Sequence, residues 1–309
     1  MGVRGLRNFI HKYHPDLMLV AITAVWGSTF VIVKGAVEQM PSFTFMALRF
    51  SLAALVMSPI LVLRLKRLDR PTLIAGCLLG LPLYAMYAFQ TFGLLGTTAS
   101  KAGFVTGLFV AFVPAIEMVW FRHRPKSTTL GGVGLAVVGL GLLTMTDHFT
   151  MGTGDLLVLG AAFFVAVHII VLSRYSPRYD VLLLVALQLA VAAALHAASA
   201  FIFETPVMPP NSGVWGAIAV TGLLASALAF FVQTHAQKTV GPTRTAVVLT
   251  AEPVFAGVFG YLWRGEVFAF RGWIGATMIL AAMFLVEVWP ALRRRRVEET
   301  LLAEEGQQA

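Results

Sequence analysis

The chain has 309 residues, of which 58% are hydrophobic and only 12% are charged. Soluble domains carry about 25% charged residues, so this composition excludes a water-soluble globular enzyme. The single cysteine, Cys77, excludes an intramolecular disulfide and any metal site built on several cysteines. A helix needs roughly 20 apolar residues to cross a bilayer. The composition therefore predicts an all-α polytopic membrane protein with almost no extramembrane domain.

Ten apolar segments are long enough to span a membrane, and short breaks rich in turn residues separate them. In chain order they cover residues 16–34, 43–63, 72–95, 99–120, 128–146, 155–173, 182–203, 213–237, 242–263 and 270–290. The first segment follows a basic stretch, as the core of a signal peptide would, but that core is shorter, at roughly 7–15 residues. We therefore expect the first segment to remain as a transmembrane helix.

The basic residues divide unevenly between the two sides of the membrane. With a cytoplasmic N-terminus, 18 of the 23 Lys and Arg residues fall on the cytoplasmic side, 4 fall outside, and Arg49 lies within a span. This distribution follows the positive-inside rule and predicts that both termini are cytoplasmic. The net charge of +8 thus reflects topology and not nucleic-acid binding. We expect the basic run to contact anionic lipid headgroups; its members are Arg293, Arg294, Arg295 and Arg296.

The two halves of the chain resemble each other weakly. A shift of 139 residues places Asp16, which opens the first segment, on Asp155, which opens the sixth. Residues 98–102 similarly resemble 241–245, and Pro114 and Pro253 follow them as expected helix breaks. Each half holds five spans, an odd number, so the two copies must have opposite orientations. Inverted repeats are a transporter architecture with the substrate site near the membrane midplane. We predict repeats at 1–150 and 151–291, followed by a cytoplasmic tail at 292–309.

Five short motifs resemble those of the drug/metabolite transporter superfamily, and most closely its bacterial EamA-type branch. They are Trp26-Gly27-Ser28-Thr29-Phe30 in the first segment, Arg49-Phe50 in the second, residues 97–104 at the fourth, Glu252-Pro253 in the ninth and Gly265-Glu266 after it. The first half departs from the family pattern, because it has Arg122-His123-Arg124 where Gly-Glu is usual. The resemblance implies ten helices in two inverted five-helix repeats around a central cavity. It also implies a bacterial inner-membrane location and, often, export of amino acids or other small metabolites.

Two charged residues, Arg49 and Glu252, lie farther inside the predicted spans than the charges near the span ends, and a charge in mid-membrane costs about 2.5–3.5 kcal/mol to insert and so needs a reason. Glu252 lies near the centre of the ninth segment, directly before Pro253, whose ring weakens the helix. Its carboxylate could bind a proton or a cationic group, or it could pair with a neighbour and stabilise the kink. Arg49 could neutralise a substrate carboxylate, pair with Glu252, or extend to the membrane surface without any function.

Other polar side chains within the spans complete the predicted cavity. They are Trp26, Ser28 and Thr29 in the first segment, Tyr84, Tyr87, Gln90 and Thr91 in the third, His168 in the sixth and Gln233 in the eighth. Hydroxyl groups facing lipid would lack hydrogen-bond partners, which favours an inward orientation of the third-segment stripe. Free histidine titrates near physiological pH, so His168 is, with Glu252, a candidate for proton coupling. Simple helix packing is the alternative interpretation of each residue.

We predict a secondary-active or facilitative transporter that works by alternating access. Its expected cargo is a small metabolite, with aromatic or neutral amino acids favoured, because a purely hydrophobic solute would not need Arg49, Tyr84, Tyr87 or Glu252. The alternative is an exporter of drugs or quaternary amines. A channel is less expected, and the sequence lacks an H-E-x-x-H motif or paired acids for an intramembrane enzyme. We expect no cofactor, no metal and no enzymatic activity, in a monomer or homodimer.

Overall fold

The computed structural model describes residues 3–97, 99–122, 125–144, 152–255, 258–259 and 270–289, and the regular structure in these ranges is all helical. The first half contains α1 (Val3–Val37), α2 (Ser42–Leu63), η1 (Leu65–Arg67), α3 (Arg70–Leu95), α4 (Ala99–Gly107), α5 (Phe109–Phe121) and α6 (Ser127–Thr144). The second half contains α7 (Thr153–Tyr175), α8 (Val181–Phe203), α9 (Ser212–Gly222), η2 (Leu223–Leu228), α10 (Ala229–Ala236), α11 (Pro242–Leu249), α13 (Phe270–Met283) and η3 (Phe284–Val288). Segments η2 and η3 are π-helical.

Most of the predicted spans coincide with helices. Seven helical stretches in the described ranges are long and apolar enough to cross a membrane, and two shorter apolar helices, Ser127–Leu142 and Phe270–Val286, accompany them. The ninth predicted segment lies partly outside the described residues, so the count of ten remains a prediction. The four arginines Arg293, Arg294, Arg295 and Arg296 and the motif Gly265-Glu266 also lie outside them.

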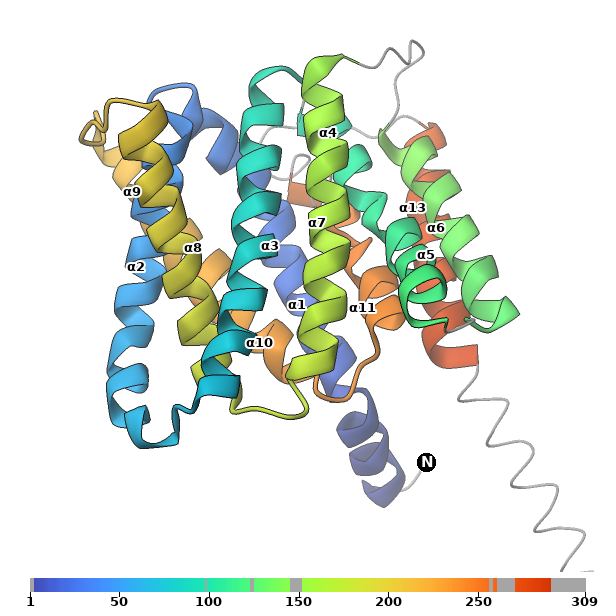
Figure 1. The fold of residues 1–309 in the computed structure, drawn as a ribbon. Helices are drawn as coiled ribbons and strands as arrows, with labels where there is room; N and C mark the ends of the chain where they lie inside the picture. The colour runs from blue at the N-terminus through green and yellow to red at the C-terminus, as the bar shows by residue number, and fades with distance from the viewer. Residues whose placement is uncertain are drawn as a thin grey trace, which may run out of the picture.

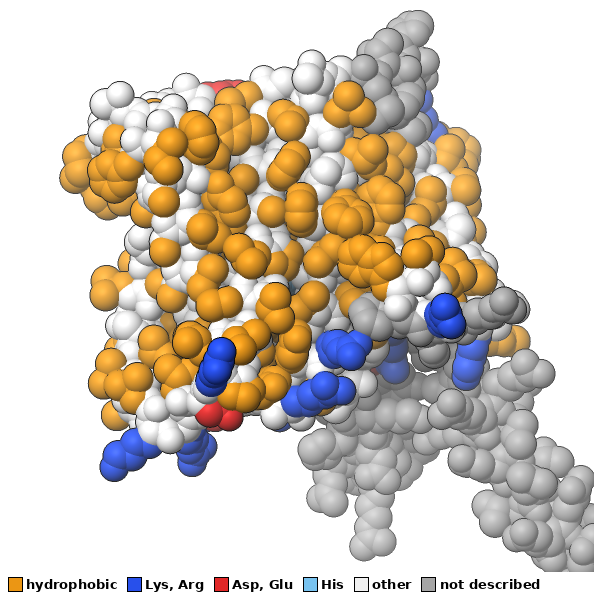
Figure 2. All heavy atoms as spheres, viewed as in Figure 1, with side chains coloured by type: hydrophobic (Ala, Val, Ile, Leu, Met, Phe, Trp, Pro, Cys, Tyr) orange, Lys and Arg blue, Asp and Glu red, His pale blue; other side chains and the backbone are white. Residues whose placement is uncertain are grey.

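The outer surface is that of a protein surrounded by lipid. Leu63 and Phe201 are 83% and 76% exposed, and apolar side chains cover most of the face in Figure 2. Lys and Arg side chains gather along the lower edge of this face. Helix α1 begins at the same edge, and the last described residues end there (Figure 1). Such a continuous apolar belt would expose too much hydrocarbon in water and is typical of membrane proteins.

The helices of the two halves interleave. Helix α2 packs on α8, α6 packs on α13, α3 packs on α7 and α8, and α1 packs on α10. If the halves are repeats, α1 corresponds to α7, α2 to α8, α3 to α10 and α6 to α13. The contacts α2–α8 and α6–α13 then each join two equivalent helices, and the contact α1–α10 is equivalent to the contact α3–α7. Helices α1 and α7, which open the two halves, run in opposite directions (Figure 1). This is the arrangement that an inverted duplication predicts.

The fourth and ninth spans are both interrupted. Helix α4 ends at Gly107 and α5 begins at Phe109, while α11 ends at Leu249 and helical structure resumes at residue 252. Proline clashes with the carbonyl four residues before it, and for Pro253 that carbonyl belongs to Leu249, the last residue of α11. Helix α5 continues through Pro114, so the interruption of the fourth span lies before this proline and not at it.

Candidate functional site

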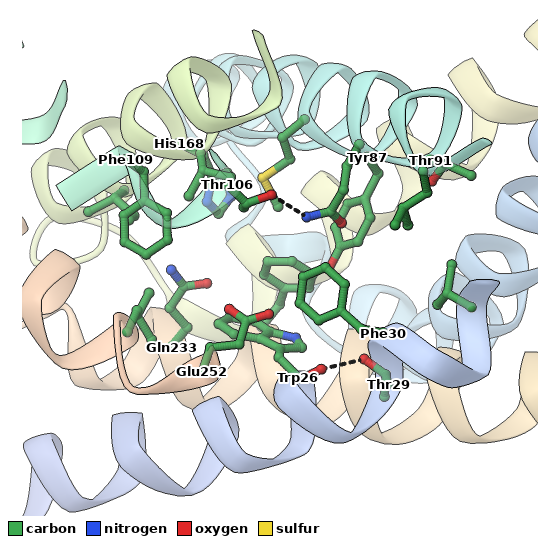
Figure 3. A pocket seen from close by; sticks show the side chains of 18 of the residues that line it. Trp26, Thr29, Phe30, Tyr87, Thr91, Thr106, Phe109, His168, Gln233 and Glu252 are labelled. Atoms are coloured by element: carbon green, nitrogen blue, oxygen red, sulfur yellow. Dashed lines mark hydrogen bonds between the residues drawn. The ribbon is translucent and has the colours of Figure 1, made fainter. Parts of the chain in front are cut away.

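A cavity lies between the two halves, near the interruptions of the fourth and ninth spans (Figure 3). Helices α1 to α5 line it from the first half, and α7, α10 and the α11 region line it from the second. Its volume is about 70 Å³.

Nine of the eleven predicted cavity residues line this space. They are Trp26, Thr29, Arg49, Tyr87, Gln90, Thr91, His168, Gln233 and Glu252. The other two lie outside it: the Ser28 hydroxyl donates to the carbonyl of Val25 at 2.7 Å, and the Tyr84 hydroxyl bonds to that of Ser199 at 2.7 Å. Tyr84 therefore joins α3 to α8, as a packing residue would.

Arg49 on α2 is buried beside the cavity, with only 2% of its surface exposed. Its Nε donates to the Ser226 hydroxyl at 2.9 Å, and its Nη2 donates to the Tyr87 hydroxyl at 3.2 Å. The guanidinium carbon lies 4.5 Å from the centre of the Tyr87 ring, a cation–π contact. Within the described residues, no acid forms an ion pair with Arg49. The side chain points inward and does not extend to the membrane surface.

The π-helical segment η2 accepts hydrogen bonds from Trp26 and Arg49, two residues that line the cavity. The Ala225 carbonyl accepts from Trp26 Nε1 at 2.9 Å and from Arg49 Nη2 at 3.5 Å, and Ser226 accepts from Arg49 Nε. A π-helical turn loosens the hydrogen-bond ladder of the helix, and such turns are frequent at functional sites. Sequence reasoning missed Ser226, because a small residue in the run Leu-Leu-Ala-Ser-Ala-Leu gives no hydropathy signal.

Glu252 lies where helical structure resumes after α11, and its carboxylate points into the cavity beside Trp26 (Figure 3). Among the residues that the structure describes, no hydrogen bond or ion pair satisfies this carboxylate. In particular, Glu252 and Arg49 line the same cavity without forming the ion pair that the sequence allowed. Gln233 of α10 projects into the space near Glu252 (Figure 3).

Hydrogen bonds connect His168, which lines the cavity from α7, to polar side chains of α8 and α10. His168 Nε2 bonds to Gln188 Oε1 at 2.8 Å, and Gln188 Nε2 donates to the Thr234 hydroxyl at 3.4 Å. His168 is thus a buried, hydrogen-bonded residue that also faces the cavity. No group of His, Cys, Asp and Glu side chains in the described ranges is arranged to hold a metal ion.

The sequence pattern of the EamA-like transporter family matches this chain twice, at residues 15–145 and 152–288. An uncharacterized transporter of Archaeoglobus fulgidus is 31% identical over 285 residues, which cover 92% of this chain and 89% of that protein. The uncharacterized inner membrane transporter YedA of Escherichia coli K12 is 25% identical over 277 residues, covering 87% of this chain and 89% of YedA. A crystal structure with 20% identity superposes with a TM-score of 0.74, covering 92% of this chain and 98% of the other, and shows the same fold.

Proposed function

The chain belongs to the EamA-like transporter family, and on this premise we propose that it is a secondary-active or facilitative carrier that exports small metabolites. The family and its relatives indicate a multi-pass membrane transporter and not an enzyme. Aromatic or neutral amino acids are the proposed cargo, and alternating access between the two repeats is the proposed mechanism. The carrier works as a monomer or homodimer. Its proposed location is the bacterial inner membrane, which agrees with the name given to YedA.

The observation that carries this proposal is a cavity between the halves where a cation and an acid both lack an ion-pair partner among the described residues. Arg49 and Glu252 line it together with the rings of Trp26, Tyr87 and Phe230. Ligand sites combine apolar and aromatic walls with a few polar groups that fix the orientation of the ligand. A small solute with an aromatic or apolar body and charged groups of both signs complements such walls.

The alternative cargo is a drug-like cation or a quaternary amine. Aromatic rings and a carboxylate recognise cations, and Trp26, Tyr87 and Glu252 would supply these groups. The buried positive charge of Arg49 would repel such a solute, so amino acids remain the favoured cargo.

A counterflow screen in proteoliposomes tests the proposal. Vesicles loaded with unlabelled amino acids, quaternary amines or nucleosides are diluted into the corresponding labelled solutes. We expect saturable exchange that is stimulated by internal aromatic or neutral amino acids. Exchange of quaternary amines without amino acids would favour the alternative cargo, and linear, non-saturable flux would indicate a channel.

Cytoplasmic termini are proposed for the topology. The gathering of Lys and Arg side chains at the edge where α1 begins supports this orientation (Figure 2). To test this orientation, a reporter that is active only in the cytoplasm, or one that is active only in the periplasm, is attached to each end of the chain.

Two polar contacts between the halves support alternating access. Asp16, near the start of the apolar part of α1, pairs with Arg244 of α11 at 2.5 Å. Asp155 of α7 accepts a hydrogen bond at 2.6 Å from the hydroxyl of Thr97, which follows the first-half helix α3. Asp16 and Asp155 correspond under the 139-residue shift, and they lie in α1 and α7, which run in opposite directions (Figure 1). We expect each contact to hold one face closed, and the two faces to open in turn.

Removing the two charges separately is expected to shift accessibility in opposite directions. Asp16→Asn should increase labelling of a cysteine placed at Thr29 from the cytoplasmic side, and Asp155→Asn should increase it from the other side. Asparagine keeps a hydrogen-bonding oxygen but loses the charge-assisted bond, which is roughly twice as strong as a neutral one. Labelling of Thr29→Cys in a Cys77→Ser background with an impermeant maleimide measures this.

The matched control is Glu38→Gln, which removes a charge from an exposed position. It should leave labelling from both sides unchanged. If both aspartate variants increase labelling from the same side, these contacts do not control opposite faces.

A further inference from the structure

The positive charge of Arg49 is buried but not neutralised within the described chain. Among the residues that the structure describes, its donors reach only neutral groups: the Ser226 hydroxyl, the Tyr87 hydroxyl and the Ala225 carbonyl. A buried charge is costly unless it is paired. An acid in place of Ser226 would cancel the charge, so the neutral acceptors of η2 position the guanidinium and leave its charge available to a ligand.

The geometry leaves specific hydrogen-bond donors for that ligand. A guanidinium has five N–H groups, and the bonds of Arg49 use Nε and Nη2. Nη1 donates to no residue in the described ranges, and Arg49 lines the cavity. The Tyr87 hydroxyl accepts from Nη2, so its own proton can be donated. Nη1 and the Tyr87 hydroxyl together offer two donors, which match the two oxygens of a carboxylate.

The surrounding walls favour an organic carboxylate over an inorganic anion. The Ala225 carbonyl that binds Arg49 also binds the indole of Trp26, so one element fixes both the cation and an aromatic wall. Phe30 and Phe230 line the same space. A ligand here meets apolar and aromatic surface next to the cation, which suits an anionic group attached to an apolar body.

We propose that Arg49 and Tyr87 form a carboxylate subsite that η2 holds in place, with Ser226 as its positioning residue. The proposal rests on the carrier function proposed above, and it names the recognised class: amphiphiles that carry a carboxylate. A cationic group on the same solute would lie toward Glu252. Quaternary amines without a carboxylate are then poor ligands.

Three solutes with the same phenyl ring and two-carbon chain isolate the charged groups: 3-phenylpropionate, phenethylamine and phenylalanine. Their binding to the purified protein in nanodiscs is measured by calorimetry. The wild-type chain should bind both carboxylates more tightly than the amine. Arg49→Gln should weaken carboxylate binding at least about tenfold, because it removes the charge-assisted hydrogen bond to the carboxylate, and it should spare the amine.

Two further variants separate a positioning role from a structural one. Ser226→Ala should weaken carboxylate binding severalfold with amine binding unchanged, and Ser226→Thr, which keeps the hydroxyl, should restore it. Tyr87→Phe should act on the carboxylates alone. Melting temperatures of the ligand-free variants show whether each one folds. Equal loss for all three solutes in a folded Ser226→Ala protein would overturn its positioning role.

The outcomes also separate this subsite from the carrier function. Arg49-dependent carboxylate binding without counterflow would support the subsite and overturn the carrier. Counterflow whose preference for carboxylates is unchanged in Arg49→Gln would support the carrier and overturn the subsite. Displacement of 3-phenylpropionate by chloride at equal concentration would show a site for inorganic anions and overturn the proposed ligand class.

Discussion

Glu252→Gln is expected to reduce transport in proteoliposomes by about tenfold to a hundredfold, the range that corresponds to losing one hydrogen bond to a charged group. The Glu252 side chain points into the cavity and has no hydrogen-bond or ion-pair partner in the described residues. Its carboxylate is therefore available to a cationic group of the solute or to a proton. Glutamine has the same shape but can carry neither the charge nor the transported proton.

The pH dependence of transport distinguishes the two roles of Glu252. If its carboxylate carries the coupled proton, residual transport by Glu252→Gln should no longer respond to a pH gradient. If it only binds a cationic group, the variant should lose affinity for amines and zwitterions but keep its pH response. Arg49, Tyr87 and His168 line the same cavity, and of these His168 is the second candidate for coupling.

The control for this experiment is Glu38→Gln, which changes an exposed carboxylate at the end of α1. It should transport as the wild-type chain does. Unchanged rate and pH dependence in Glu252→Gln would contradict both roles of Glu252. A pH response that survives in Glu252→Gln and disappears in His168→Asn would assign coupling to the histidine.

Hydropathy predicted the helical membrane fold because lipid constrains every spanning helix in the same way. It did not predict the interruption at Leu108 or the π-helical η2, since neither depends on how apolar the segment is. Both depend on which backbone N–H and C=O groups bond to each other along the helix. Helix α1 begins at Val3, well before the apolar segment at residue 16, because a helix can continue beyond the apolar part of its sequence.

The polar side of the cavity was predictable, and its apolar side was not. Polar side chains facing lipid would lack partners, so a polar residue within a span favours an interior position. That argument found Arg49, Gln90 and Glu252, but it also selected Tyr84, whose hydroxyl instead joins two helices. Apolar cavity residues such as Phe30 and Phe230 look like lipid-facing residues in sequence, because hydropathy does not distinguish the two surroundings.

Gly139→Ala is expected to destabilise the fold, whereas Gly134→Ala in the same helix, α6, is not. A Cβ at Gly139 would lie 2.7 Å from the carbonyl oxygen of Gly275 and 2.9 Å from the Cβ of Met278, both on α13. The backbone oxygen cannot move away without separating the two helices. A Cβ at Gly134 has no neighbour within 4 Å, so alanine there should gain up to about 1 kcal/mol of helix propensity.

The difference between the two variants isolates the helix–helix contact, since both make the same substitution in one helix. Overpacking costs about 1–3 kcal/mol, and close approach at small residues is a main source of helix association in membranes. We expect the melting temperature in detergent to fall by several degrees for Gly139→Ala only, and equal melting temperatures would contradict this account of α6 and α13. Neither glycine lines the cavity. A transport defect that persists per folded molecule of Gly139→Ala would therefore mean that this contact changes during the transport cycle.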